Sequence, residues 1–226
     1  MVKTKLIPHY EFLREFSKQK PESIYYVVGT EAYLKDQIYK AVKKRFSDES
    51  SEDFDFTLLY GDSDDSMQVI EHLEMSPFLA KKRLVVIKNF DQMNAAGKNL
   101  IAEYCKNPSP TSVLLLIADK SDKRAKAIKV IEQKSVIISC RPPYSTKDLV
   151  RWLRSEVQVR NIAMDYDTMC IFADSIELDY LIASNELEKL VIYTRNKGSI
   201  SRETVEEVIG KAKANKIFDL QDAIGK

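Results

Sequence analysis

Up to residue 140, the chain alternates short apolar runs, typical of β-strands, with longer segments that carry apolar residues at helical spacing. Residues 84–87 form an apolar run between two charged residues, the pattern of a parallel strand buried on both faces. Further strands are predicted at residues 24–28, 54–60, 113–117 and 135–140. Helices are predicted at residues 10–17, 31–46, 94–105 and 125–133, and after the turn at 61–64, where Met67, Ile70 and Leu73 would face inward. This alternation predicts an α/β domain with a parallel sheet and helices on both faces.

The pattern changes at Arg141-Pro142-Pro143, after which no strand is predicted. Ser145 and Asp148 have the spacing of a capping box, and they open a helix with Leu149, Trp152, Leu153 and Val157 on one face. Further helices are predicted at residues 166–173 and 178–195 and after Ser201, with Val205, Val208 and Ile209 inward. We therefore expect residues 1–143 to form the α/β domain and residues 144–226 to form a small helical lid domain.

Composition limits the classes of function. The 226 residues are 44% hydrophobic and 31% charged, which is typical of a globular protein. A formal net charge of +1 means that nucleic acid could be bound only through a local patch. Cys105, Cys140 and Cys170 are widely spaced, and neither His9 nor His72 lies near a cysteine in sequence, so no metal site or disulfide is expected. No apolar stretch is long enough to span a membrane, so a cytoplasmic protein without a membrane partner is expected.

An α/β domain followed by a helical lid is common among phosphate-loop nucleotidases, so the turn after the first predicted strand is where a phosphate loop would lie. Such a loop reads G-x-x-x-x-G-K-[ST]. Counted from Gly29, the lysine is present as Lys35, but Leu34 replaces the second glycine and Asp36 replaces the hydroxyl that binds magnesium. A branched side chain hinders the curl of the loop, and a carboxylate repels phosphate.

The second half of a nucleotidase site is an acidic pair that follows a hydrophobic strand and orients magnesium and water. After residues 84–87 the chain has Lys88-Asn89 instead, and Asp91 lies too far along to substitute without a bulge. Two independent requirements of a nucleotidase site are not met, so we expect the α/β architecture without nucleotide hydrolysis. We assign no catalytic residue, metal ligand or cofactor.

The segment before the strand at 84–87 is unusually apolar for a helix end. Met75, Pro77, Phe78 and Leu79 place apolar side chains beside a proline that stops the preceding helix. Such a cluster is either a plug in the core or a docking site for a partner. The residues by themselves leave both interpretations open.

The densest run of basic residues follows the strand predicted at 113–117. It could contact a DNA backbone, or it could be the solvated face of a helix. Its members are Lys120, Lys123, Arg124, Lys126 and Lys129.

Four stretches together resemble a known family, the delta subunit of bacterial DNA polymerase III, which is the clamp-loader subunit that opens the sliding clamp. They are Tyr26–Leu34, Ser76–Leu79 leading to Arg83–Val86, Asn185–Tyr193 and Phe218–Ile224. Their order extends over nearly the whole chain. The resemblance implies an AAA+ fold with a degenerate nucleotide site, in agreement with the failed phosphate loop. The family also has a helical collar domain, which we expect to be absent from this chain.

The resemblance also implies a role for the apolar segment. In the family, a pair of hydrophobic residues at this point inserts into a pocket on the clamp and releases one clamp interface. Phe78 matches the second residue of the pair, whereas Pro77 stands where many members have leucine, so Met75 or Leu79 is expected to take part of the role. The docking interpretation is therefore favoured over the core plug.

The partners that the resemblance implies are the sliding clamp (beta subunit), the gamma/tau and delta prime loader subunits, and primer-template DNA in the assembled loader. The protein would act in DNA replication without hydrolysing ATP itself, as part of a DNA-directed DNA polymerase holoenzyme. Two alternatives remain. An active AAA+ or P-loop nucleotidase requires a glycine at position 34 and an acidic pair near 88, and a stand-alone nucleic-acid-binding module requires a marked basic excess. The sequence has none of these features.

Overall fold

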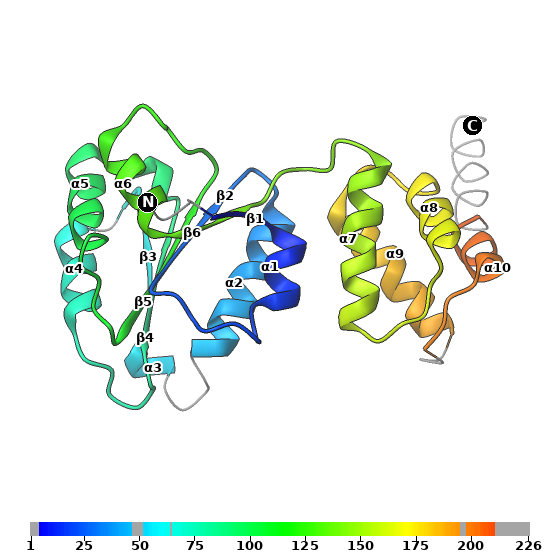
Figure 1. Ribbon diagram of the computed structural model, residues 1–226, viewed down its shortest axis with the longest axis horizontal. Helices are drawn as coiled ribbons and strands as arrows, with labels where there is room; N and C mark the ends of the chain where they lie inside the picture. The colour runs from blue at the N-terminus through cyan, green and yellow to red at the C-terminus, as the bar shows by residue number, and fades with distance from the viewer. Residues whose placement is uncertain (1–4, 47–51, 64, 195–197, 211–226) are drawn as a thin grey trace, which may run out of the picture. The chain divides into compact units, whose positions relative to one another are not determined.

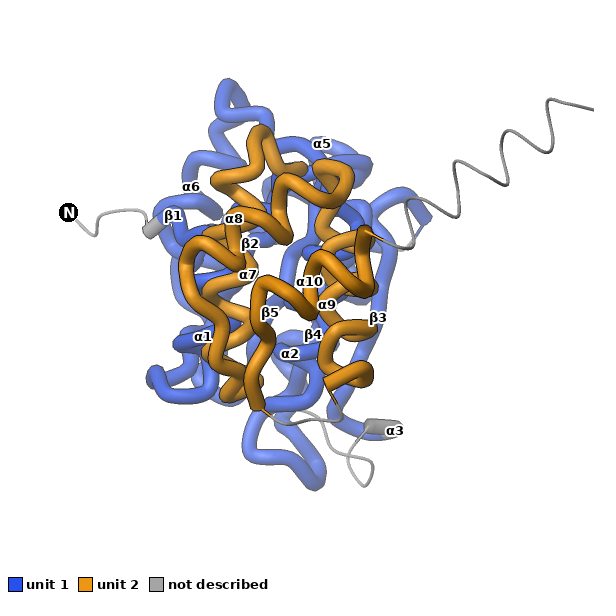
Figure 2. The backbone as a smooth tube through the Cα atoms, turned by 90° about the vertical axis from the view of Figure 1, so that its right-hand side faces the viewer, with its two compact units in different colours: residues 1–141 blue, residues 142–226 orange. Residues whose placement is uncertain are grey.

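The computed structural model describes residues 5–46, 52–63, 65–194 and 198–210, and the chain divides into two compact units, residues 1–141 and 142–226 (Figure 2). The first unit contains all the strands of the described residues, and the second contains helices. Within the described residues no helix is long and apolar enough to cross a membrane. The predicted C-terminal stretch 218–224 lies outside the described residues.

The first unit is built on a parallel sheet of six strands, ordered β1-β6-β2-β5-β4-β3 (Figure 1). The strands are β1 (Lys5–Pro8), β2 (Ile24–Val28), β3 (Phe56–Tyr60), β4 (Arg83–Lys88), β5 (Ser112–Ala118) and β6 (Val136–Ser139). Every residue of β5 is buried, because this strand lies inside the sheet and is covered on both faces. The predicted α/β fold with a parallel sheet is confirmed.

Helices cover both faces of the sheet (Figure 1). On one face lie α1 (His9–Glu15) and α2 (Ala32–Phe46), and on the other lie α4 (Ser66–Glu74), α5 (Ala95–Tyr104) and α6 (Lys126–Lys134). On α2, Leu34, Ile38 and Val42 recur at helical spacing and are fully buried. On the opposite face, the rings of Tyr26 and Phe90 meet edge to face within a buried hydrophobic cluster.

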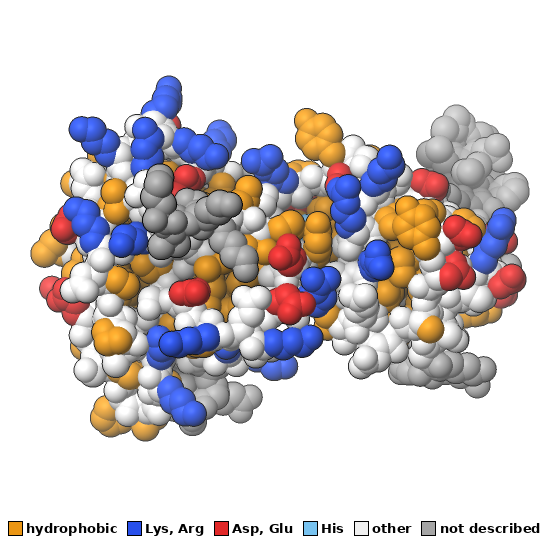
Figure 3. Space-filling model, viewed as in Figure 1, with side chains coloured by type: hydrophobic (Ala, Val, Ile, Leu, Met, Phe, Trp, Pro, Cys, Tyr) orange, Lys and Arg blue, Asp and Glu red, His pale blue; other side chains and the backbone are white. Residues whose placement is uncertain are grey.

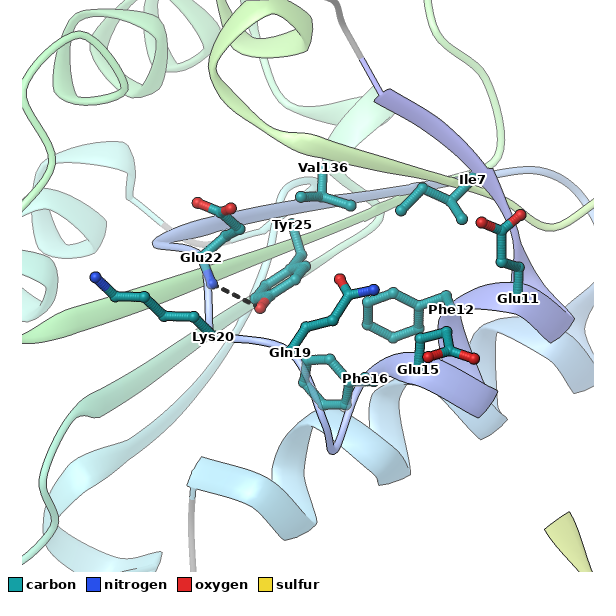
Figure 4. Close-up of a pocket in the computed structure, with 10 residues that line it drawn as sticks. All are labelled: Ile7, Glu11, Phe12, Glu15, Phe16, Gln19, Lys20, Glu22, Tyr25 and Val136. Atoms are coloured by element: carbon teal, nitrogen blue, oxygen red, sulfur yellow. Dashed lines mark hydrogen bonds between the residues drawn. The ribbon is translucent and has the colours of Figure 1, made fainter.

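An aromatic cluster joins α1 to the sheet. The rings of Phe12 and Phe16 lie 5.7 and 5.6 Å from the ring of Tyr25 on β2, and all three are buried (Figure 4). The hydroxyl of Tyr25 accepts a hydrogen bond of 2.9 Å from the backbone N–H of Glu22 (Figure 4). These contacts pack the N-terminal helical segment against β2.

The structure corrects three predicted details. Strand β1 was not predicted, and the strand predicted at 54–60 begins at Phe56, because Glu52–Asp55 form the short helix α3. Met67 is 54% exposed instead of facing inward. Helix α4 buries Val69 and Leu73, and at about 100° per residue Met67 falls on the opposite side of the helix.

The second unit is helical, as predicted. It comprises α7 (Thr146–Val159), α8 (Tyr166–Asp174), α9 (Tyr180–Tyr193), α10 (Arg202–Val205) and the helical turn η2 (Glu206–Gly210). The capping box opens α7: the backbone N–H of Ser145 donates to the Asp148 carboxylate at 3.2 Å. Trp152 and Tyr180 are buried with their rings 5.8 Å apart, so they tie α7 to α9.

Candidate functional site

The loop between α4 and β4, residues 75–82, exposes large apolar side chains and is called the Phe78 loop below. Phe78 is 74% exposed, Leu79 56% and Met75 52%, while Pro77 is half-buried. Figure 3 shows hydrophobic side chains at the lower left surface, where Figure 1 places this loop. A phenylalanine that is three quarters exposed does not fill a core, so the core-plug alternative is wrong for Phe78.

A second aromatic ring stands beside Phe78. Phe54, from the short helix α3, is 53% exposed, and its ring centroid lies 5.4 Å from that of Phe78 at an angle of 40°. The two rings therefore form one exposed apolar surface, built from segments that are far apart in sequence. Phe54 was expected to belong to a strand, so this pairing was not predicted.

A buried carboxylate holds the backbone of the Phe78 loop in place. Asp55, next to Phe54, has no solvent-exposed surface. Its carboxylate accepts hydrogen bonds from three successive backbone N–H groups, those of Phe78 at 2.5 Å, Leu79 at 2.6 Å and Ala80 at 2.6 Å. Successive N–H groups that converge in this way form a positive concavity that suits an anion.

The charge state of Asp55 follows from these contacts. Burial by itself raises the pKa of this carboxyl, but the N–H groups of Ala80, Phe78 and Leu79, followed by the nearby guanidinium of Arg83, lower it by more. The net effect is a pKa below the ordinary value of 3.8. Asp55 is therefore ionised at neutral pH, and its hydrogen bonds to the loop are charge-assisted.

Arg83, the first residue of β4, completes this arrangement. Its guanidinium is buried with Nη2 3.7 Å from Oδ1 of Asp55, and the same nitrogen donates a 2.8 Å hydrogen bond to the carbonyl of Phe54. Its backbone N–H donates to the carbonyl of Thr111 at 2.9 Å, next to β5. Arg83 thus links α3, the loop and the central sheet.

The turn that would hold a phosphate loop is short and closed. Helix α2 begins at Ala32, directly after Gly29, Thr30 and Glu31. Gly29 has a φ of +145°, and a Cβ placed there would lie 1.8 Å from the carbonyl oxygen of Cys140. The residue is glycine because the chain passes so close to the end of β6.

Two backbone amides of this turn already have partners. The N–H of Gly29 donates to the carbonyl of Ala118 at 3.1 Å, and the N–H of Glu31 donates to that of Cys140 at 3.1 Å. Leu34, at the position of the missing glycine, is fully buried on α2. Phosphate binding requires amides that point into an open loop, and these two are directed at the neighbouring strands.

The side chains around the turn are likewise engaged with one another. Lys35, at the position of the phosphate-binding lysine, forms an ion pair with Asp119, which follows β5. Asp36 pairs with Lys40 one helical turn later at 2.6 Å. Oδ1 of Asp91 accepts a 3.1 Å hydrogen bond from the N–H of Asp119. These carboxylates thus form ion pairs and hydrogen bonds with other groups of the protein. Among the described residues, no group of acidic, histidine or cysteine residues is arranged to hold a metal.

The predicted basic cluster is exposed at the carboxyl end of β5. Lys120, Lys123 and Arg124 lie in the loop before α6, whereas Lys126 and Lys129 lie on α6, and Figure 3 shows Lys and Arg side chains in this region at the upper left. Arg124 is paired with Asp122 at 2.9 Å. The cluster is thus shared between a loop and the solvated face of α6, and its positive charge is offset by an interleaved carboxylate.

Asp55, Arg83 and Phe54 are the functional candidates that the sequence analysis missed. A signal was present, since aspartate is depleted in strands and the prediction placed Asp55 inside one. Arg83 was noticed as a flanking charge, but flanking charges are normally exposed. Neither signal indicates the partner, because the contacts join residues 23 to 25 positions apart.

The arrangement of a parallel α/β unit followed by a helical unit has a counterpart among solved structures. Among solved structures, the chain is similar to the Bacillus subtilis DNA clamp loader delta protein YqeN, with a TM-score of 0.80 and 16% identity over 96% of this chain and 72% of that one. The likeness at this identity shows the fold.

The family follows from the sequence comparison. The family model "DNA polymerase III, delta subunit" matches residues 25–141, just over half of the chain. The chain therefore belongs to the DNA polymerase III delta subunit family. It is 20% identical over 227 residues to the Bacillus subtilis DNA polymerase III subunit delta, covering 95% of this chain. It spans 65% of the length of that relative.

Proposed function

We propose that this chain binds the sliding clamp of DNA polymerase III through the Phe78 loop and acts as the clamp-opening subunit of a clamp loader. The observation that carries the proposal is that Phe78 is 74% exposed although the backbone beneath it is held by a buried carboxylate. A protein that only needed to fold would gain nothing from presenting an aromatic ring in this way.

The geometry suits an anchor. An exposed aromatic side chain gains most from entering an apolar pocket, and aromatic residues dominate the energetics of many interfaces. Because the loop backbone is fixed before binding, little conformational entropy is lost on docking. Phe54 widens the apolar surface at the ring, and Met75, Pro77 and Leu79 supply the flanks of the same loop.

We further propose that the chain neither binds nor hydrolyses ATP. The closed turn at Gly29, the burial of Leu34 and the pairing of Lys35 with Asp119 support this. The proposed clamp site and the closed nucleotide site lie at opposite ends of the parallel sheet, since one precedes β4 and the other follows β2. Clamp binding would therefore proceed without a nucleotide in this subunit.

The remaining proposed partners are those of the assembled clamp loader. We propose that the full-length protein meets the gamma/tau and delta prime subunits and, with them, primer-template DNA. Lys120, Lys123, Arg124 and Lys126 are the candidates for contact with the DNA backbone. Direct DNA binding by this chain alone is not favoured, because Asp122 pairs with Arg124 and the net charge is +1.

The location of the clamp site is tested by amide hydrogen exchange on the wild-type chain with and without the cognate clamp. New protection at residues 75–82 and at Phe54 is expected, with no change at residues 29–35. Binding that protects the second unit alone, or the absence of binding, would refute the proposal.

A further inference from the structure

We infer that Asp55 is a positioning residue for clamp docking: its buried carboxylate sets the loop backbone from which Phe78 projects. The inference rests on the proposed clamp-binding function and deepens it, because it assigns the pre-ordering of the loop to one side chain. Asp55 itself, being fully buried, does not touch the partner.

The contacts of Asp55 are unusually concentrated. Its two carboxylate oxygens accept three backbone N–H groups at 2.5 to 2.6 Å, from Phe78, Leu79 and Ala80. These residues belong to neither a helix nor a strand, so the backbone hydrogen bonds that fix a regular element are not available to them. The carboxylate of Asp55 thus supplies the hydrogen-bond acceptors that backbone carbonyls of a neighbouring strand supply within a sheet.

The carboxylate is in turn held in place. Arg83 lies 3.7 Å from it and donates to the carbonyl of Phe54, the residue before Asp55. Because Arg83 is the first residue of β4, its contact with the carboxylate holds Asp55 in place relative to the central sheet. Phe54, adjacent to Asp55, also meets the ring of Phe78 at 5.4 Å. One short segment, residues 54–55, therefore fixes both the backbone and the ring of the anchor.

An amide in place of this carboxylate should loosen the loop without altering its sequence. Asp55→Asn has nearly the same volume, but its neutral oxygen is a weaker acceptor, and its NH₂ group opposes a backbone donor instead of accepting from it. The Phe78 ring would keep its chemistry and lose its fixed position. Clamp binding would then be weaker, because the loop would lose conformational entropy on docking.

The experiment compares wild type, Asp55→Asn, Phe78→Ala and a control, Asp165→Asn. Asp165 caps α8 in the second unit by accepting from the backbone N–H of Thr168 at 2.7 Å, so its substitution also removes a carboxylate that caps backbone N–H groups, but far from the loop in sequence. The readouts are the affinity for the clamp, the thermal midpoint, and the NMR shifts and exchange rates of the amide protons of Phe78, Leu79 and Ala80.

In wild type we expect these amide protons to resonate downfield and to exchange slowly, because each donates a short bond to a charge. Asp55→Asn should abolish that signature and weaken clamp binding about tenfold, while Asp165→Asn changes neither. If Asp55→Asn retains the signature and the wild-type affinity, the inference is overturned. It is also overturned if Asp165→Asn, at a similar loss of thermal midpoint, weakens clamp binding equally.

Two further outcomes separate this inference from the proposed function. If Phe78→Ala weakens binding and Asp55→Asn does not, the proposed function stands and the positioning role falls. If wild type does not bind the clamp, the proposed function is refuted, and the role of Asp55 in docking is refuted with it. Should Asp55→Asn not fold, wild type still decides: rapid exchange of the three amides, at the rate of an unstructured peptide, refutes the role of Asp55.

Discussion

The buried carboxylate of Asp55 accepts a hydrogen bond from the backbone N–H of Phe78 at 2.5 Å, across 23 positions of sequence. The same residue, Phe78, presents its ring to solvent. Its backbone is therefore held by a hydrogen bond to a buried charge, while its side chain is among the most exposed apolar groups of the described chain. This combination of a fixed backbone and an exposed ring suits the docking role proposed for the Phe78 loop.

ATP binding and turnover are expected to be absent. The backbone amides of Gly29 and Glu31 donate to neighbouring strands, and Lys35 is paired with Asp119. The measurement is nucleotide affinity and steady-state hydrolysis in the presence of magnesium, with Lys35→Ala as the matched control. Micromolar binding together with turnover above that control would contradict the prediction.

Gly29→Ala is expected to destabilise the first unit by at least about 2 kcal/mol, because the new Cβ would meet the Cys140 carbonyl in a backbone conformation that side chains rarely adopt. Gly210→Ala is the control, since a Cβ at Gly210 meets nothing within 4 Å. Denaturant unfolding of both variants provides the comparison. Equal stability of the two would show that β2 and β6 do not approach each other as described.

The contribution of Asp55 to stability is expected to depend on pH in one direction. The folded pKa of Asp55 is lowered from 3.8, chiefly because the backbone N–H groups of the loop overcome the effect of burial. A lowered folded pKa gives a contribution that is fully present above the unfolded pKa and is lost as the pH falls through the folded pKa.

The stability difference between wild type and Asp55→Asn should therefore be constant at neutral pH and shrink below about pH 4. Urea unfolding of both proteins across this range measures it, and the comparison cancels the carboxylates that the two proteins share. A difference that grows on acidification would contradict the assignment.

Much of the fold could be predicted from sequence because the central strands are buried on both faces. Residues 84–87 and 113–117 are continuous apolar runs for that reason. Strand β1 was missed because it is a four-residue edge strand that contains a lysine and a proline and leaves Leu6 exposed. Edge strands carry such residues, so their pattern resembles a loop.

The candidate site was only partly predictable. The sequence identified Phe78 and the mismatches at Leu34 and Asp36, because these depend on the residue type at one position. The contacts of Asp55 with the loop, and of Glu31 with Cys140, join segments that are brought together only by the sheet. No local pattern encodes such contacts, so the sequence singles out Phe78 as a candidate anchor but not the side chains that hold its loop.

The central claim is that Phe78 anchors the clamp, and one variant tests it. Phe78→Ala should weaken binding to the cognate clamp by about 2 kcal/mol, roughly thirtyfold, while the thermal midpoint stays near that of wild type. Tyr166→Ala, which removes a 64% exposed ring from α8, should change neither quantity. Unchanged clamp affinity, with a loss of about 3 to 5 kcal/mol of folding stability as for a core aromatic, would contradict the account.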